Sequence, residues 1–550
     1  MLVVSPKGTV NSVIRVGSQS AIKNALDQGK AASLAGYEGA SYVVPLNPST
    51  AGAVSASVTK TGTGAATLVP TIAPHTLVEI KIDTAGALGT MKIRWRVGGS
   101  GAFSEPILST AVSFVFRVPG TFCTLTFAAG AYVLNSTYTV GLNGTVVVGG
   151  GGIATVTQAS SPIDDCDFAI TVKKGGLPGV AVLSVSPDGG VSTLPDLLVP
   201  STGVVIVPGT GIVLTASGTF VIDEVYSFLA IAPTYSTSDL TNALTALFAD
   251  ETAKFSLIDI PGIPATAAGA ISAAAAVESA LQTAYSSQGI DVQAFVNCPF
   301  LGDTVLSGGA PIVDVADDSA ALRTAREGQS LLRTALFYGS SRLTDSSTSW
   351  KLKRGRSVAV AKRYTEHDPN VDVSDRELGP LDVYAMGVDA QDYQELDDAQ
   401  FNGYQSERNL GEGAFVAVTS GGYSVKNLNT DADWQDAMGV RALNCCLRAL
   451  RPVLDRLRGK RPKANADGTI DETVAKGWDS MVNNAIRRGG GLGKGALFTQ
   501  PQVSDAGANI LRTSQVGDSP HQVDVEYFVE KLGFVAGVSA TGTYSGIITV

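Results

Sequence analysis

The 550-residue sequence contains little of the material from which catalytic and metal-binding sites are built. It has three histidines, His75, His367 and His521, and none of them is paired at the spacing of a metalloprotease or zinc motif. No GxSxG or Walker sequence occurs either. We therefore expect that the chain is not an enzyme and binds no metal or cofactor.

Charge and long apolar runs are also scarce. Only 16% of the residues are charged, and the longest weakly polar stretches, residues 141–156 and 265–277, are shorter than the ~20 apolar residues that a membrane-spanning helix needs. The first residues show no signal peptide. A net charge of −10 disfavours direct binding to nucleic acid. We expect no membrane insertion, and assembly in the cytoplasm.

Cysteine is rare and odd in number. The five residues include the neighbours Cys445 and Cys446, and no CxxC pair occurs. This pattern favours buried, reduced thiols over a disulfide framework. The alternative is that Cys123 or Cys166 forms cross-links between copies of the chain after release into an oxidising medium.

The character of the sequence changes near residue 230. Residues 1–230 hold 12 basic and 12 acidic residues and are rich in Gly, Val, Thr and Ser, so the rest of the chain carries the whole net charge. The patterns typical of helices also lie in this second part. The contrast indicates β modules attached to an α/β body.

The first part contains an internal repeat. Residues 79–89 (EIKIDTAGALG) resemble residues 169–179 (AITVKKGGLPG), and residues 125–133 resemble residues 213–221. The offset drifts from 90 to 88 residues, as a short loop deletion would produce. Alternating runs separated by Gly, Pro and Asp-Gly turns predict two small β-sandwiches.

The second part alternates between helical and strand-like patterns, which predicts a sheet flanked by helices. We expect helices over residues 238–249, 265–286, 318–337, 433–458 and 471–488. We expect strands over residues 255–260, 292–298, 357–361, 414–418, 523–532 and 544–550.

Basic residues gather along the helix expected at 433–458 and just beyond it. Five leucines follow one face of this helix, and arginines lie on the opposite side. One interpretation is a solvated helix face whose charges complement the helix dipole. The other is an attachment surface for an acidic protein partner.

Both ends of the chain are apolar and suited to β-structure. Val10, Ile14 and Val16 alternate as on an edge strand, and residues 545–550 (SGIITV) end the chain with Ile547, Ile548 and Val550. Chain ends are usually polar and frayed. These ends are therefore candidate arms that add strands to a sheet of the same chain or of a neighbour.

The order of these features resembles the contractile tail sheath proteins of myovirus bacteriophages and of related contractile injection systems. The resemblance covers residues 231–550 and the N-terminal arm. Its residues are GRSVAVA at 355–361 followed by LGPL at 378–381, GEGAFVA at 411–417, and the ADGTI turn at 466–470 between the last two expected helices.

The resemblance implies a multidomain α+β fold with an α/β sheath-like core, two inserted, duplicated β-sandwich-like modules and strand-like arms. The expected parts are an N-terminal arm (1–25), a linking segment of the core (26–64), the first module (65–142), the second module (157–230), the α/β core (231–430), a tube-facing C-terminal domain (431–535) and a C-terminal arm (536–550).

The resemblance also implies a structural role in a virion tail. Sheath subunits stack as hexameric rings around a tube and contract to drive it through the host envelope. The expected partners are further copies of the chain, the tail tube protein, and the baseplate and tail terminator proteins. The candidate contacts to the tube are Arg441, Arg448, Arg451, Arg456 and Arg458.

Two functions of other classes stay open at this point. The chain can be a tail-fibre-like surface protein whose β modules bind glycans, in which case function lies in residues 65–230 and no polymer forms. It can also be an α/β enzyme with β accessory domains, although no catalytic constellation supports this.

Overall fold

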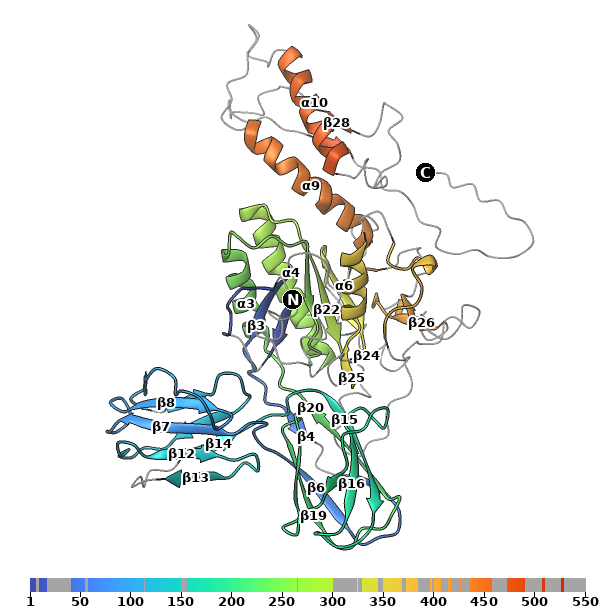
Figure 1. Ribbon diagram of the computed structural model, residues 1–550. Coiled ribbons are helices and arrows are strands. Elements are labelled where there is room, and N and C mark those ends of the chain that lie inside the picture. The colour runs from blue at the N-terminus through green and yellow to red at the C-terminus, as the bar shows by residue number, and fades with distance from the viewer. Residues whose placement is uncertain are drawn as a thin grey trace, which may run out of the picture.

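A computed structural model shows an α/β body with two β units at one end and a pair of long helices at the other (Figure 1). The structure describes residues 1–5, 9–16, 41–54, 58–112, 114–149, 156–264, 266–299, 324, 329–344, 350–367, 372–383, 396–397, 400–406, 414–416, 425–427, 429, 436–457, 472–489, 507–509 and 526–528.

The body is built around a parallel three-stranded sheet in the order β21–β22–β23. Its strands are β21 (Leu257–Ile260), β22 (Gln293–Cys298) and β23 (Thr334–Tyr338). Every residue of β22 is buried. This is expected of the central strand of a parallel sheet, which is covered on both faces.

Three helices pack on this sheet or on each other: α3 (Thr237–Ala249), α4 (Ala267–Gln288) and α6 (Ser357–Glu366). A capping box starts α3, in which the Ser236 hydroxyl accepts from the Asp239 backbone N–H and the Asp239 carboxylate accepts from the Ser236 N–H. Helix α4 ends at Gly289, whose left-handed backbone (φ 70°) is the usual helix stop. Both ends therefore follow from local sequence.

The start of the chain belongs to the body. Strands β1 (Leu2–Val4), β3 (Ser41–Leu46) and β2 (Ile14–Val16) form a small sheet in the order β1–β3–β2, with β1 parallel to β3. Leu2 and Leu46 are fully buried in the same hydrophobic cluster as Ile258 and Val296 of the central sheet. Burying these aliphatic side chains contributes roughly 2 kcal/mol each.

Two of the predicted elements in the body are wrong. Thr334–Tyr338 forms strand β23 although a helix was expected over 318–337, and Ser357–Glu366 forms helix α6 although a strand was expected at 357–361. A short apolar run suits a buried strand and a buried helix equally well. The first turn of α6 is fixed by a distant residue, because the Ser357 N–H donates to Asn297 Oδ1 at 3.0 Å.

Smaller elements complete the body. They are the hairpin of β24 (Ser340–Thr344) and β25 (Lys351–Gly355), the turn η2 (Arg376–Leu378), and the pair β26 (Tyr404–Ser406) and β27 (Ala414–Val416). The strand expected at 414–418 corresponds to β27. The β24–β25 hairpin was not predicted, and it contacts the second β unit.

The first β unit consists of two sheets in the orders β13–β12–β7–β8–β9 and β10–β11–β14. Its strands are β7 (Val78–Thr84), β8 (Lys92–Val97), β9 (Ile107–Leu108), β10 (Phe114–Arg117), β11 (Thr124–Phe127), β12 (Thr137–Val140), β13 (Val146–Gly149) and β14 (Val156–Ala159). The two sheets enclose one hydrophobic cluster.

The second β unit has the sheets β17–β16–β15–β20–β4, with β5 also on β20, and β18–β19–β6. Its strands are β4 (Ala53–Val54), β5 (Thr59–Thr61), β6 (Thr67–Ile72), β15 (Cys166–Lys174), β16 (Val182–Ser186), β17 (Leu197–Leu198), β18 (Val204–Val207), β19 (Ile212–Ser217) and β20 (Val225–Ile231). It has a hydrophobic cluster of its own.

The strand pairing divides the chain differently from the expected modules at 65–142 and 157–230. Strand β6 lies in the second unit although residues 67–72 fall in the first expected module. Strand β14 pairs with β11 in the first unit. The first unit is thus inserted into the second, between β6 and β15. Sequence could not show this, because an alternating strand fits either unit.

The helices expected near the C-terminal end are present as α9 (Ala437–Leu457) and α10 (Glu472–Gly489), which pack against each other. The described residues beyond them form the short pair β28 (Gly507–Asn509) and β29 (Glu526–Phe528), and β29 lies within the expected strand 523–532. The helix pair and the β units lie at opposite ends of the body (Figure 1).

Candidate functional site

The most elaborate polar arrangement in the described part of the chain lies at the joint between the body and the second β unit. Arg354 on β25 donates from Nη1 to Asp164 Oδ1 at 2.7 Å and from Nη2 to Asp164 Oδ2 at 2.6 Å. The exposed fractions of the two side chains are 3% and 9%. A paired, two-pronged contact of this kind fixes direction as well as distance.

A second group of contacts extends the joint along the hairpin. Arg342 on β24 is paired with Asp167 and donates to the Asp188 carbonyl oxygen, and the Lys351 N–H donates to Asp188 Oδ2 at 3.0 Å. Trp350, at the start of β25, lies against Gly209 of the second β unit. The hairpin therefore holds the unit at several points.

Residues of the second β unit help to keep the Asp188 carboxylate charged. Burial alone would raise the pKa of its carboxyl group, but hydrogen bonds outweigh burial and lower that pKa below its ordinary value. The donors are the Ser192 hydroxyl and N–H, the Lys351 N–H and the Ser186 hydroxyl. The carboxylate is therefore kept charged.

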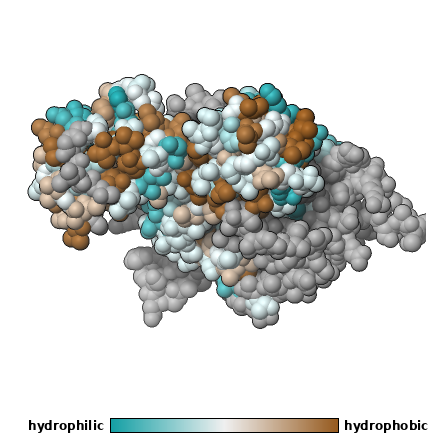
Figure 2. All heavy atoms as spheres, turned by 90° about the horizontal axis from the view of Figure 1, so that it is seen from below, coloured by the Kyte–Doolittle hydropathy of each residue, from teal (hydrophilic) through white to brown (hydrophobic). Residues whose placement is uncertain are grey.

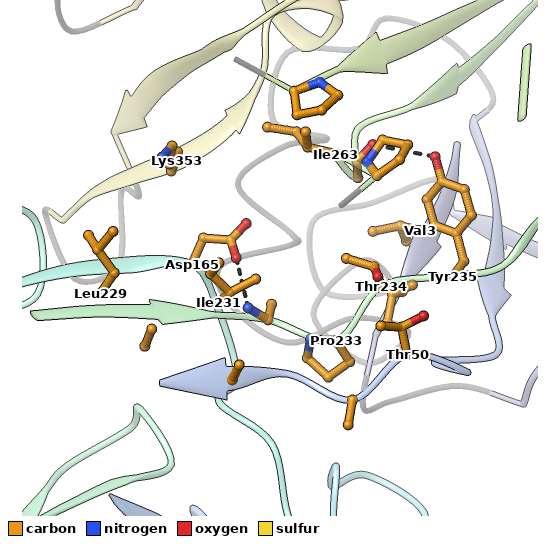
Figure 3. A pocket seen from close by; sticks show the side chains of 18 of the residues that line it. Val3, Thr50, Asp165, Leu229, Ile231, Pro233, Thr234, Tyr235, Ile263 and Lys353 are labelled. Carbon is orange, nitrogen blue, oxygen red and sulfur yellow. Dashed lines mark hydrogen bonds between the residues drawn. The ribbon is translucent and has the colours of Figure 1, made fainter. Parts of the chain in front are cut away.

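A cavity of about 250 Å³, lined mainly by apolar atoms, lies beside these contacts (Figure 3). It is lined by Val3 of β1, by the chain crossing at 229–235, and by residues of the loop after β21 such as Ile263. Asp165 accepts from the Ala232 N–H at 2.7 Å on one wall. The cavity leaves unfilled space where the two parts meet.

The joint can hold and orient the β units. Arg354 and Arg342 form ion pairs with Asp164 and Asp167 across the interface. Among the described residues, no group of three or more His, Cys, Asp or Glu side chains is placed to hold a metal ion. No described helix is long and apolar enough to cross a membrane.

Exposed apolar side chains are concentrated on the β units. Of the large hydrophobic residues that are exposed in the described part of the chain, all but Met481 lie between Val69 and Ile222. They include Val112, which is 91% exposed. Seen from below, the molecule shows several brown patches on this end (Figure 2). The β units therefore carry most of the exposed large apolar side chains in the described part of the chain.

The structure places the predicted N-terminal arm residues in the body. Ile14 and Val16 lie on β2, which pairs with β3, while Val10 lies in a turn. Val16 is buried, and Val10 and Ile14 are partly buried. Of the predicted C-terminal arm, Ile547, Ile548 and Val550 lie outside the described residues.

The arginines predicted to face the tube mostly bind within the chain. Arg441 is buried, lies over the Tyr364 ring and donates to the carbonyl oxygen of His367. Arg448 and Arg451 both bind Asp291, through its carbonyl oxygen and its carboxylate respectively.

Arg456 is exposed, and Arg458 lies outside the described residues. The contacts of Arg441, Arg448 and Arg451 hold α9 on the body. Of the five predicted arginines, Arg456 is the one in the described part of the chain whose side chain is exposed.

The two cysteines considered for cross-linking are unpaired and buried in the cores of different β units. Burial raises the pKa of the Cys123 thiol to about 11, in spite of a hydrogen bond with Ser160. Burial also raises the pKa of the Cys166 thiol, and the neighbouring carboxylates of Asp164 and Asp165 add to the rise. Both observations favour reduced thiols.

Sequence reasoning missed the residues of the joint. Asp164 and Arg354 are 190 positions apart in the chain, and no motif joins them. The available signals were weak. Two aspartates, Asp164 and Asp165, precede strand β15. Strand β25 carries the basic residues Lys351 and Lys353, and Arg342 on β24 pairs with Lys353.

The fold is similar to solved structures of sheath proteins. A sheath tail protein from Listeria innocua is 9% identical, with 96% of this chain and 91% of that chain covered and a TM-score of 0.40. One from Desulfitobacterium hafniense is 12% identical, with coverage of 92% and 89% and a TM-score of 0.38.

The helical sheath of the anti-feeding prophage in its contracted state is 15% identical, with coverage of 57% and 78% and a TM-score of 0.38. All three are named as sheath proteins. No protein-family model and no curated protein matches the chain.

Proposed function

We propose that this chain is a structural subunit of a contractile tail sheath. It polymerises as stacked hexameric rings around a tail tube, contacts the baseplate and tail terminator proteins at the two ends of the tail, and contracts to drive the tube through the host envelope. The sequence features at 355–361, 411–417 and 466–470 support this reading.

The observation that carries the proposal is the placement of two different surfaces at opposite ends of the body (Figure 1). At one end, the sparsely charged β units expose many of the large apolar side chains. At the other end, α9 exposes Arg456, and Arg451 on the same helix binds Asp291 of the body. A subunit that surrounds a tube faces the tube on one side and the outside of the tail on the other, and two unlike surfaces fit this position.

The joint fits a machine that switches between two packings. Its paired charges fix the β units in one orientation, while the cavity beside them leaves room for a second packing of the same elements. Transitions of this kind proceed by rigid movement of parts about an interface. In this proposal contraction is driven by energy stored in subunit interfaces.

The arms connect neighbouring subunits. Because β1 and β2 lie in the body's own small sheet, residues 536–550 are the arm proposed to add a strand to a neighbour's sheet. The apolar sequence of residues 545–550 suits such pairing.

Negative-stain electron microscopy of the purified protein over a concentration series tests the proposal. Hollow tubes or stacked six-fold rings are expected. A variant lacking residues 540–550 should fail to assemble while its thermal unfolding stays unchanged. Uniform monomers or dimers of the full chain at every concentration would sink the sheath function and favour the glycan-binding alternative. Tubes of normal length from the truncated variant would refute the proposed role of the C-terminal arm in assembly.

A further inference from the structure

The two β units share one strand arrangement. In both, four strands follow the same order, β12–β7–β8–β9 in the first unit and β20–β15–β16–β17 in the second. An isolated bridge joins Gly86 to Tyr132 in the first unit, and an equivalent one joins Gly176 to Phe220 in the second. The sequence repeat therefore corresponds to a repeated topology of six strands, β7–β12 and β15–β20.

Each set of six strands is completed by two more. In the first unit β13 pairs with β12 and β14 with β11, whereas in the second β5 pairs with β20 and β6 with β19. Val148 lies opposite Tyr138, and Lys60 lies opposite Tyr226. Since Tyr138 and Tyr226 are equivalent, Lys60 and Val148 occupy equivalent places.

The second completing strand gives the same correspondence. Leu68 lies opposite Ala216, as Val156 lies opposite Phe127, and all four side chains are buried in a core. By burial Phe127 and Ala216 are equivalent, one position away from the alignment of residues 125–133 with 213–221. Leu68 and Val156 are 88 positions apart, as are Tyr138 and Tyr226. The sequences agree, because residues 66–68 read ATL and residues 154–156 read ATV.

The strands that precede each set of six strands in the sequence do not pair with that set in the structure. Strands β5 and β6 directly precede β7–β12 in the sequence but complete the unit formed by β15–β20. Strands β13 and β14 directly precede β15–β20 but complete the unit formed by β7–β12. Each sequence repeat thus gives its first two strands to the other repeat.

We propose that the β units are two tandem repeats that have exchanged their first two strands within one chain, and that the Lys60–Glu224 ion pair selects this exchanged arrangement over the one in which each repeat closes on itself.

The ion pair sits where an exchanged strand meets its host unit. Lys60 on β5 lies 3.3 Å from Glu224, whose side chain is 2% exposed. Glu224 also accepts from the Gly64 N–H at 2.5 Å and from the Tyr226 hydroxyl at 3.0 Å. The segment before β20 and the segment of β5 and β6 are therefore joined by a charge pair whose carboxylate is buried and whose lysine is 22% exposed.

The first unit has no counterpart of this pair. The places of Glu224 and Lys60 are taken there by Ser136 and Val148, and the Ser136 hydroxyl is buried without a hydrogen-bond partner. If each repeat closed on itself, Lys60 would meet Ser136, and Glu224 would face Val148 with no cation. A buried carboxylate that loses its partner is strongly destabilising, so the charges exclude that arrangement.

The inference goes beyond the proposed function and does not depend on it. Its consequence concerns the sequence repeats, because the repeat β5–β12 cannot be separated from the repeat β13–β20 without breaking the β6–β19 and β11–β14 ladders. Neither repeat can therefore unfold without removing strands from both units.

Disulfide trapping tests which arrangement is present. The hydroxyl oxygens of Thr67 and Ser217 lie 2.8 Å apart, so Thr67→Cys with Ser217→Cys should oxidise rapidly. The matched control is Thr67→Cys with Ala128→Cys, because exposed Ala128 follows Phe127 as Ser217 follows Ala216. Peptide mass spectrometry after mild oxidation should find the 67–217 link in high yield and almost no 67–128 link.

Moving the charge tests the selecting role of the ion pair. Ser136→Glu combined with Glu224→Ser should raise the 67–128 link at least several-fold and lower the 67–217 link. Glu224→Gln alone provides a milder variant that should move both yields in the same directions.

A 67–128 link in the native charge background, or links that join two copies of the chain on non-reducing gels, would overturn the intrachain exchange. Unchanged yields in both charge variants would overturn the role of Lys60 and Glu224.

Discussion

Removing the Asp164 carboxylate should loosen the joint between the body and the β units. In Asp164→Ala, the Arg354 guanidinium loses both of its short hydrogen bonds to that carboxylate, at 2.7 and 2.6 Å, while it stays almost entirely buried. Breaking a buried pair from one side costs about 3–5 kcal/mol. We expect a loss of this size in the unfolding transition that involves the joint.

The assay is equilibrium denaturation in urea followed by tryptophan fluorescence, because Trp350 lies against Gly209 of the second β unit and should report separation of the two parts. Asp83→Asn is the matched control. Asp83 pairs with Arg94 on the surface of the first unit, with exposed fractions of 28% and 34%, so its loss should cost less than ~1 kcal/mol.

A double replacement, Asp164→Leu with Arg354→Met, removes both charges. It therefore separates the cost of leaving Arg354 buried without a partner from the net contribution of the ion pair. Two apolar side chains leave no uncompensated charge, so most of the stability should return. The reasoning about the joint is refuted if Asp164→Ala costs no more than the surface control, or if the double replacement is as damaging as the single one.

Three further predictions concern other parts of the chain. Arg456→Glu should leave thermal unfolding unchanged, because the side chain is exposed, and should weaken binding to an acidic tube surface in a co-sedimentation assay. Cys123 and Cys166 should react with a thiol reagent only as fast as the β units open, since both are buried; fast labelling of the folded chain at pH 8 would contradict this. Glu224 and Asp188 have lowered pKa values in the folded chain, so their stabilising contribution is present at neutral pH and should be lost as the pH falls below the ordinary values of 4.5 and 3.8; a Glu224→Gln variant should show a shallower loss in acid.

Much of the fold followed from local pattern. The alternation of apolar residues in β15 places Phe168, Ile170 and Val172 in the core, as a half-buried strand requires. Helix α9 carries the strongest apolar stripe in the sequence and spans nearly the expected range. These elements were predictable because their periodicity depends only on neighbouring residues.

Other elements were decided by residues far away in the sequence. The apolar run at 357–361 became a helix where Asn297 accepts from its first turn, and the run at 334–338 became a strand beside β22. Most of the arginines assigned to a partner surface proved to bind Asp291 or backbone oxygens of the body. A sequence shows that a charge is present but not which opposite charge lies within reach.

The sequence by itself determined the chain's division into a sparsely charged, repeated β part and an acidic α/β part, because composition and periodicity are local properties. Only the tertiary structure decided which unit each strand completes. Strands β6 and β14 both alternate and fit either unit. Which unit they join depends on the ion pair between Lys60 and Glu224, which are 164 positions apart. Long-range charge pairing of this kind leaves no local trace in the sequence.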